Sequence, residues 1–140
     1  MDSNETVLKH IGFLLAKNYQ RLCSIFKEEF SGYDITPQQF GLLRFLWEED
    51  GLTQVELSCR SQIDRTTIGG LIDRMENAGL LLRTPRSGDR RAYSISLTEK
   101  GERLRQELLP LSQKAEERFL SSLSGEEIDI LKNLLDKLRF

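Results

Sequence analysis

Residues 80–97 carry the pattern of a β-hairpin, inside a chain whose other segments follow helical spacing. Apolar residues alternate with serines along Tyr93–Leu97, which is typical of a half-buried strand, and Leu80–Leu82 forms a second apolar run before it. Pro85 and Gly88 mark the turn between the two strands. This pattern restricts the fold to a mainly α-helical one with a single small β-hairpin.

Four arginines lie near the predicted turn, at Arg83, Arg86, Arg90 and Arg91, although the formal net charge of the chain is -2. Positive charge is therefore concentrated at one place on an acidic background. Guanidinium groups bind phosphates through forked hydrogen bonds and suit narrow, electronegative grooves. The hairpin is accordingly predicted to be the wing of a DNA-binding domain.

Helix start and stop signals divide the rest of the chain. Apolar residues at helical spacing predict one long first helix from Val7 to Phe30, ended by Ser31 and Gly32. Pro110 lies inside a later helical pattern, so a kink or a break is expected there. Each later helix is predicted to begin at a side chain that can cap its first turn: Thr36, Thr53, Asp64, Thr98 and Ser124. The predicted order is four helices, the hairpin and two more helices.

The short helices before the hairpin predict a helix-turn-helix, with the turn at Arg60–Ile63. The helix capped by Asp64 is then the recognition helix, which enters the major groove. Arginine can pair with guanine, threonine can bond to bases or phosphates, and glycine lets the backbone approach DNA closely. Unpaired amides of the first helical turn are expected to bind phosphate. The side chains and glycines predicted to face DNA near the start of this helix are Arg65, Thr66, Thr67, Gly69 and Gly70.

Each of these features also has a purely structural explanation. Gly69 and Gly70 could serve close helix packing, and Arg65 and Arg74 could pair with neighbouring acids. Arginines on a hairpin can simply protect a strand edge. The order of turn, polar recognition face and basic wing favours DNA binding over these explanations.

Three segments carry the pattern of a known family: Asp64–Leu80, Asp89–Arg91 and Leu97–Gly101. Through them, and over nearly its whole length, the chain resembles the MarR family of bacterial and archaeal transcription regulators. The resemblance implies a winged helix-turn-helix in which helices at both chain ends intertwine into a homodimer. The expected organisation is an N-terminal dimerisation helix in residues 1–34, a DNA-binding domain in 35–98 and C-terminal dimerisation helices in 99–140.

The resemblance also implies roles at the DNA. Arg91 would enter the minor groove, and Asp89 would orient a nearby arginine, either Arg74 or Arg91 itself. The family often has a larger, basic residue where this chain has Gly70, so its base-reading pattern departs from the family here. The complete set of expected DNA contacts is Thr53, Gln54, Ser61, Arg65, Thr66, Thr67, Gly69, Gly70, Arg74, Arg86, Asp89, Arg90 and Arg91.

Apolar stripes on the first helix and on the two helices after the hairpin predict a dimer independently of the resemblance. They are too extensive for a three-helix core and a wing to cover, and exposed patches of that size usually mark an interface. A two-fold dimer predicts a palindromic operator whose half-sites lie about one helical turn apart, roughly 34 Å. The alternative is that these helices fold back onto their own domain.

Members of the family commonly release DNA when a small aromatic or anionic ligand binds, or when a cysteine is oxidised. The resemblance places the ligand where the dimerisation helices meet the DNA-binding lobe, and aromatic side chains with a few cations suit an aromatic carboxylate. The candidate residues, whose aromatic members could equally be core, are His10, Phe13, Lys17, Phe40, Arg44 and Trp47.

Redox sensing has less support than ligand binding. Cys23 is predicted to be a small buried hydrophobe, whereas Arg60 beside Cys59 could lower the pKa of that thiol. Neither cysteine lies where a peroxide sensor of the family would place it. With one histidine and two cysteines, the chain cannot complete a zinc site without carboxylates, and no metal or cofactor is expected.

Several other classes of protein do not fit this chain. Its 140 residues suit one domain with dimerisation helices, and no apolar run approaches the roughly 20 residues that span a bilayer. The N-terminus lacks the basic start of a signal peptide, so a cytoplasmic location is expected. The sequence contains neither a phosphate-binding glycine loop nor a nucleophile elbow, so an enzyme is not expected. Two alternatives stay open: a winged helix that binds a protein, and a DNA-binding repressor without a ligand.

Overall fold

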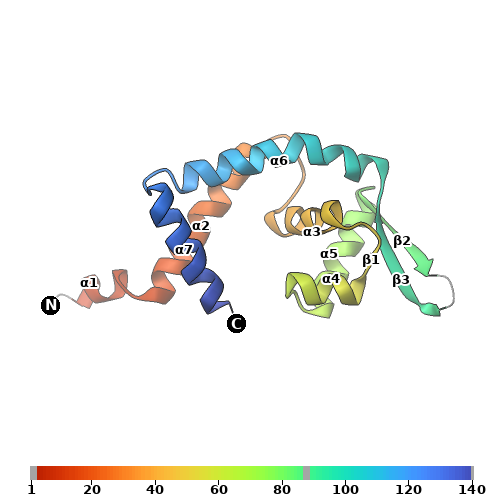
Figure 1. The fold of residues 1–140 in the computed structure, drawn as a ribbon, viewed down its shortest axis with the longest axis horizontal. Coiled ribbons are helices and arrows are strands. Elements are labelled where there is room, and N and C mark those ends of the chain that lie inside the picture. Colours follow the sequence, from red (N-terminus) through yellow and green to blue (C-terminus); the bar gives the residue numbers. More distant parts are fainter. Residues whose placement is uncertain (1–2, 87–88, 140) are drawn as a thin grey trace. The chain divides into compact units, whose positions relative to one another are not determined.

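The computed structural model describes residues 3–86 and 89–139, with side chains for residues 6–86 and 93–139. The chain divides into two compact units, whose helices and strands are labelled in Figure 1. We call Gly32–Leu109 the winged unit, and the described segments before Gly32 and after Leu109 together the terminal unit.

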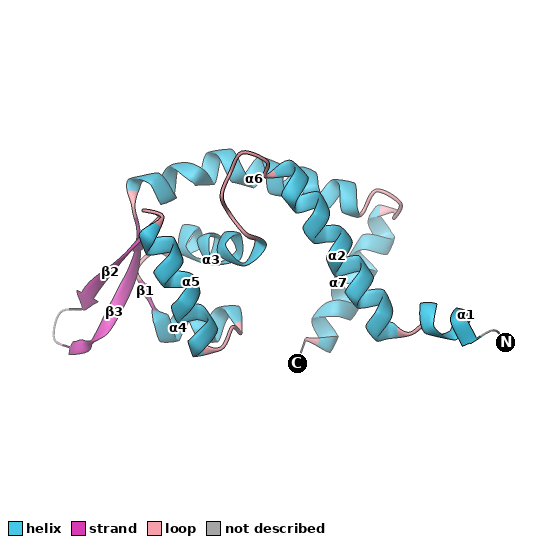
Figure 2. Ribbon diagram, turned by 180° about the vertical axis from the view of Figure 1, so that it is seen from behind, coloured by secondary structure: helices cyan, strands magenta, loops and turns pink. Residues whose placement is uncertain are grey.

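The winged unit combines three short helices with a three-stranded antiparallel sheet of order β1-β3-β2. Figure 2 shows the three helices grouped on one side of the strands. Within the unit, the predicted helix-turn-helix and hairpin are confirmed. Its elements are α3 (Pro37–Glu48), β1 (Leu52–Thr53), α4 (Gln54–Ser61), α5 (Arg65–Asn77), β2 (Leu81–Arg86), β3 (Asp89–Leu97) and the first part of α6 (Glu99–Phe119).

Local capping interactions begin the helices of the winged unit where the sequence predicts them. The Thr36 hydroxyl accepts from the Gln39 amide at 3.2 Å, and the Gln39 side chain accepts from the Thr36 amide at 3.1 Å. Thr53 and Glu56 form the same reciprocal pair before α4. Because these contacts lie within four residues, sequence alone specifies them.

The sheet contains one strand that the sequence analysis did not predict. Leu52 and Thr53 pair with Ile95 and Ser94, so β3 is hydrogen-bonded along both edges at this point. Two residues are too few for a periodic pattern, and their pairing depends on a strand some forty residues later. Asp50 fixes the approach to this strand, because its carboxylate accepts from the Leu97 amide at 2.9 Å.

The core of the winged unit joins all its elements. Ile68 and Ile72 of α5 and Ile95 of β3 are fully buried. Trp47 is also buried, and its indole N–H donates to the Gly101 carbonyl at 3.0 Å. Gly101 is required here because a methyl group at this position would overlap the Leu80 carbonyl oxygen. The start of α6 is thereby held against α3 and the end of α5.

The terminal unit consists of α1 (Ser3–Leu8), α2 (Ile11–Glu29), the end of α6 and α7 (Gly125–Leu138). Arg118 binds Glu28 at 2.6 Å and Glu29 at 2.8 Å, which ties α6 to α2. Ser124 begins α7 with the predicted capping box. None of the described helices is long and apolar enough to cross a membrane.

The prediction of one continuous first helix is wrong, and so is one of the two alternatives expected at Pro110. The first helix is interrupted, because His10 adopts an extended backbone and its Nδ1 accepts from the Gly12 amide at 3.2 Å, which starts a new helix. Conversely, α6 runs through Pro110 without the break that was one of the two expected outcomes there. A proline removes one helical N–H, and the buried Leu108 and Ala115 on either side anchor the helix.

Candidate nucleic-acid interface

The recognition helix α5 is fixed at its start by Asp64. One carboxylate oxygen accepts from the Thr67 amide at 2.8 Å, and the other accepts from the Thr67 hydroxyl at 2.7 Å. These two hydrogen bonds hold the pKa of the Asp64 carboxyl below its ordinary value. The Thr67 amide is therefore already occupied, and the expectation of an open first turn is wrong at this residue.

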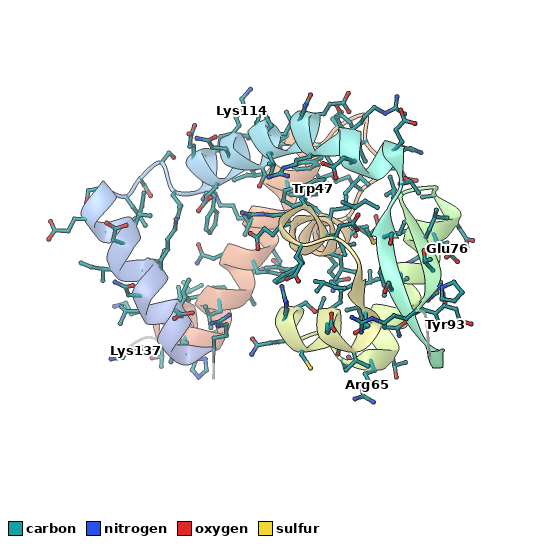
Figure 3. All side chains as sticks on the ribbon, turned by 45° about the vertical axis from the view of Figure 1, so that its right-hand side comes forward. Trp47, Arg65, Glu76, Tyr93, Lys114 and Lys137 are labelled. Carbon is teal, nitrogen blue, oxygen red and sulfur yellow. The ribbon has the colours of Figure 1, made fainter. Side chains whose placement is uncertain are left out.

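The outward side of α5 follows from what its inward side buries. Ile68, Leu71, Ile72 and Met75 are buried, which turns the opposite side of the helix to solvent. Figure 3 shows Arg65 extending away from the body of the winged unit. We call the outward residues Arg65, Thr66, Gly69, Gly70 and Arg74 the reading face. Its three side chains are exposed, and the two glycines are partly covered.

The glycines of the reading face are covered by neighbouring polar side chains. A Cβ atom built on Gly69 would lie 3.2 Å from Nε2 of Gln54, the first residue of α4. A Cβ on Gly70 would lie 3.6 Å from Nη1 of Arg74, because helical side chains lean toward the N-terminus over the preceding turn. Gly69 therefore accommodates a side chain of α4, as the packing explanation anticipated, but that side chain is polar.

Other predicted DNA contacts hold the helix-turn-helix together. The Ser61 hydroxyl donates to the Leu57 carbonyl at 2.6 Å and accepts from the Ile63 amide at 3.3 Å. Gln62 between them has a φ of 59°, in the left-handed region. The Thr53 hydroxyl is engaged by the Glu56 amide. The structure gives Thr53, Ser61 and Thr67 a positioning role beside any contact with DNA.

The arginines of the hairpin differ in their surroundings. Arg83 is only 24% exposed and binds Asp73 at 2.6 Å and Glu76 at 3.4 Å, and its backbone amide donates to Glu76 at 3.0 Å. Figure 3 places Glu76 on α5 beside the hairpin. Arg86 is exposed and lies 3.7 Å from Glu56. Arg83 thus fastens the hairpin to α5, and its guanidinium group is ion-paired with two acids of that helix.

The sequence analysis missed this clamp of Asp73, Glu76 and Arg83. The sequence does contain a pattern that indicates the clamp, because two acids three residues apart on one helix precede an arginine on the next strand. In the hairpin, Leu81 lies opposite Leu97 and Pro85 lies opposite Tyr93, so Pro85, which was expected to mark the turn, lies in β2 instead. The predictions for Asp89, Arg90 and Arg91 concern side chains outside the described part of the structure.

The predicted ligand contacts fall in both units. In the terminal unit His10 caps α2, and Lys17 lies 5.6 Å from the Phe13 ring centre. In the winged unit Phe40 and Trp47 are buried and meet edge to face at 5.9 Å, so both serve the core. Arg44 is exposed and lies 6.0 Å from the Phe40 ring centre.

The two cysteines also lie in different units. Cys23 is half-buried, so the prediction of a buried residue is only partly correct, and a hydrogen bond with it raises the pKa of Tyr19. Cys59 is exposed. Across the described residues, no group of three or more histidine, cysteine or acidic side chains is placed to hold a metal ion.

Comparison with known proteins finds a matching family and similar transcription regulators. The family model described as the MarR family matches residues 35–93. The HTH-type transcriptional repressor NicR of Pseudomonas putida is 33% identical over 126 residues, which cover 89% of this chain and 80% of the relative.

Two solved structures are similar over almost the entire chain. Bordetella bronchiseptica BpsR, in a study of how 6-hydroxynicotinic acid regulates its DNA binding, has a TM-score of 0.87 at 27% identity and covers 94% of each chain. A mutant MarR from E. coli complexed with operator DNA has a TM-score of 0.87 at 26% identity and covers 100% of each chain.

Proposed function

Because this chain belongs to the MarR family of transcriptional regulators, we propose that it represses transcription by binding a palindromic operator as a homodimer, until a small ligand releases it. The observation that carries the proposal is the reading face of α5, where exposed polar groups stand opposite a fully apolar, buried side. Such a helix, preceded by a capped turn and followed by a basic hairpin, suits the major groove.

The terminal unit supports the homodimer. No residue of α7 is buried, and its apolar side chains Ile130, Leu134 and Leu138 are exposed, the last by 72%. Ile11 of α2 is exposed by 64%. Leaving this many apolar side chains exposed to water is unfavourable. A second copy of the chain would cover them through a self-complementary contact.

In the proposed complex, a two-fold dimer places two recognition helices in successive major grooves, about 34 Å apart. Each reading face would contact base edges, and the arginines of each hairpin would approach the flanking backbone or minor groove. A dimer bound over a promoter would exclude the transcription machinery, and the naming of the relative NicR as a repressor supports repression over activation.

The proposed ligand is an aromatic acid. The naming of 6-hydroxynicotinic acid for the BpsR structure supports this class of compound. Within this chain, Lys17 beside Phe13 combines a cation with an aromatic ring, the chemistry that suits an aromatic carboxylate. A ligand that binds the released form more tightly by a few kcal/mol is sufficient to shift operator occupancy.

A selection from random duplexes followed by titration tests the proposal. The protein should enrich a palindromic sequence, and its affinity for that sequence should fall steeply as salt rises. Adding 6-hydroxynicotinic acid or a related aromatic acid should weaken binding. Failure to enrich any sequence at low ionic strength would overturn the proposal, and affinity unchanged by every acid tested would reject its ligand-release part.

A further inference from the structure

We infer that the carboxamide of Gln54, although it comes from α4, reads a base pair of the operator through the gap that Gly69 leaves in the recognition helix. The inference rests on the proposed DNA-binding function and deepens it by assigning a specificity-determining residue. Gln54 would favour adenine at one position of each half-site.

The gap at Gly69 is the first observation. On a recognition helix, a side chain at this outward position would itself face the groove. Here the surface is formed by Gln54, whose Nε2 would lie only 3.2 Å from a Cβ at residue 69. A glycine at this place therefore brings the amide of another helix onto the reading face.

The second observation is that the Gln54 carboxamide makes no hydrogen bond to any described residue, whereas the polar groups beside it are occupied. The hydroxyls of Thr53 and Ser61 hold the first and last turns of α4. The Thr67 hydroxyl donates to Asp64. The Gln54 carboxamide has no hydrogen-bond partner within the described residues, and the side chain is half-buried. Its donor and acceptor therefore remain available to a ligand.

The position of Gln54 is well determined, which a base-reading residue requires. It is the first residue of α4, directly after the reciprocal capping pair of Thr53 and Glu56. Thr53 is also paired with Ser94 in the sheet. Because the backbone is held on both sides, little backbone freedom is lost when the side chain meets a base.

The chemistry of a primary carboxamide selects adenine. In the major groove, adenine presents the N7 acceptor beside the N6 amino donor, and a glutamine side chain can bond to both. Such a bidentate pair discriminates against another base by about fivefold to about 150-fold. Arg74, which covers Gly70, carries a charge and can bind phosphate or guanine, so its effect should differ from that of Gln54.

The experiment begins with the sequence selected by the wild-type protein. Three proteins are compared: the wild type, Gln54→Ala and, as a matched control, Gln106→Ala, which changes an exposed glutamine of α6. The affinity of each protein is measured for that duplex and for every single-base-pair variant of it. Gln54→Ala should lose adenine preference at one position per half-site and retain the preferences elsewhere. Its salt dependence should not change, because the side chain is neutral.

Two further measurements distinguish a direct contact between Gln54 and a base from an indirect structural role of this side chain. Replacing adenine by 7-deazaadenine at that position removes the N7 acceptor, and should weaken the wild type but not Gln54→Ala. Gly69→Ala should displace the amide and lose the same preference, with no additional loss in the Gln54→Ala, Gly69→Ala double variant. The helical backbone of residue 69 accepts alanine, and circular dichroism confirms that each variant is folded.

The outcomes are distinguishable. If Gln54→Ala weakens every duplex equally and keeps the wild-type preferences, the inference is wrong while DNA binding stands. The inference is equally wrong if 7-deazaadenine weakens binding of the wild type and of Gln54→Ala to the same extent. If the wild type selects no sequence at all, the proposed function fails and this inference fails with it.

Discussion

The arginines of this protein differ in their structural surroundings, and the sequence alone does not distinguish them. Arg65 is exposed at the start of the recognition helix, whereas Arg83 is held by Asp73 and Glu76 against the hairpin. Composition predicts a cationic hairpin, but it cannot say which guanidinium groups are neutralised by acids of the same fold. Contacts between α5 and β2 decide that, and they form only when the chain is folded.

Replacing Arg65 should affect DNA binding and not folding. Arg65→Ala is expected to weaken operator affinity at least tenfold and to lower the salt slope by about one, because one phosphate-directed charge is lost. Titrations at several salt concentrations measure both. Arg103→Ala, which removes an exposed arginine from α6, is the matched control. Equal losses in the two variants would show that only net charge matters.

Replacing Arg83 should have the opposite profile. Arg83→Ala removes two ion pairs, so Asp73 loses its cation and Glu76 keeps only the hydrogen bond from the residue-83 amide. We expect the free energy of unfolding to fall by about 1 kcal/mol, discounted because the site is partly exposed. Urea denaturation followed by circular dichroism measures the change. Stability equal to the wild type, within about 0.5 kcal/mol, would contradict the clamp.

The cap at Asp64 predicts a pH dependence. Its pKa is lowered by the Thr67 hydrogen bonds, so its stabilisation is present above the ordinary carboxyl pKa and is lost as pH falls through the lowered value. Asp64→Asn retains an N-cap without that titration. The urea midpoint of this variant should therefore decrease less than the wild-type midpoint between about pH 5 and about pH 3. An equal decrease in the wild type and in Asp64→Asn would contradict this explanation.

At the scale of helices and strands, local signals predicted most of the fold. The caps at Thr36, Thr53 and Ser124 need only their own next three residues, and all were confirmed. The missed β1 and the wrongly joined α1 and α2 depend on other interactions. β1 needs its partner β3, and the break at His10 arises from an imidazole acting as a cap, which is an uncommon choice.

The junction between α5 and α6 predicts a matched pair of glycine variants. Gly101→Ala places a methyl group against the Leu80 carbonyl, and we expect a loss of about 1–3 kcal/mol in the free energy of unfolding. Gly41→Ala, inside α3, meets no atom within 4 Å and should be neutral or stabilising by up to about 1 kcal/mol. Urea titrations in parallel measure both, and similar losses would refute the steric explanation.

For the whole molecule, the sequence predicted exposed apolar faces on the terminal helices, and the terminal unit has them on α2 and α7. The candidate ligand residues show where sequence reasoning stops. Periodicity shows that Phe40 and Trp47 are apolar positions of one helix. It does not show that the Trp47 indole donates a hydrogen bond to Gly101, which comes much later in the sequence. Burial of that kind follows from the tertiary fold.

The proposed dimer predicts the effect of a charge on α7. Leu134 is 53% exposed, and Leu134→Glu would place a carboxylate in the apolar surface of both copies. We expect dissociation to monomers in sedimentation velocity, with operator affinity reduced at least a hundredfold because two half-sites are no longer bound together. Asn133→Glu, at an exposed polar position next to it, should remain dimeric. A dimeric Leu134→Glu variant would exclude α7 from the interface.

Trp47 is the only tryptophan of the chain, and it lies buried in the winged unit with its indole N–H bonded to Gly101. Its fluorescence therefore reports the integrity of one unit alone, from a blue-shifted emission in the native protein to a red-shifted one after exposure to water. Helical circular dichroism, in contrast, sums over both units. Where the two signals lose amplitude at the same denaturant concentration, the units melt as one cooperative block, and where they separate, the intrinsic fluorophore shows which unit melts first.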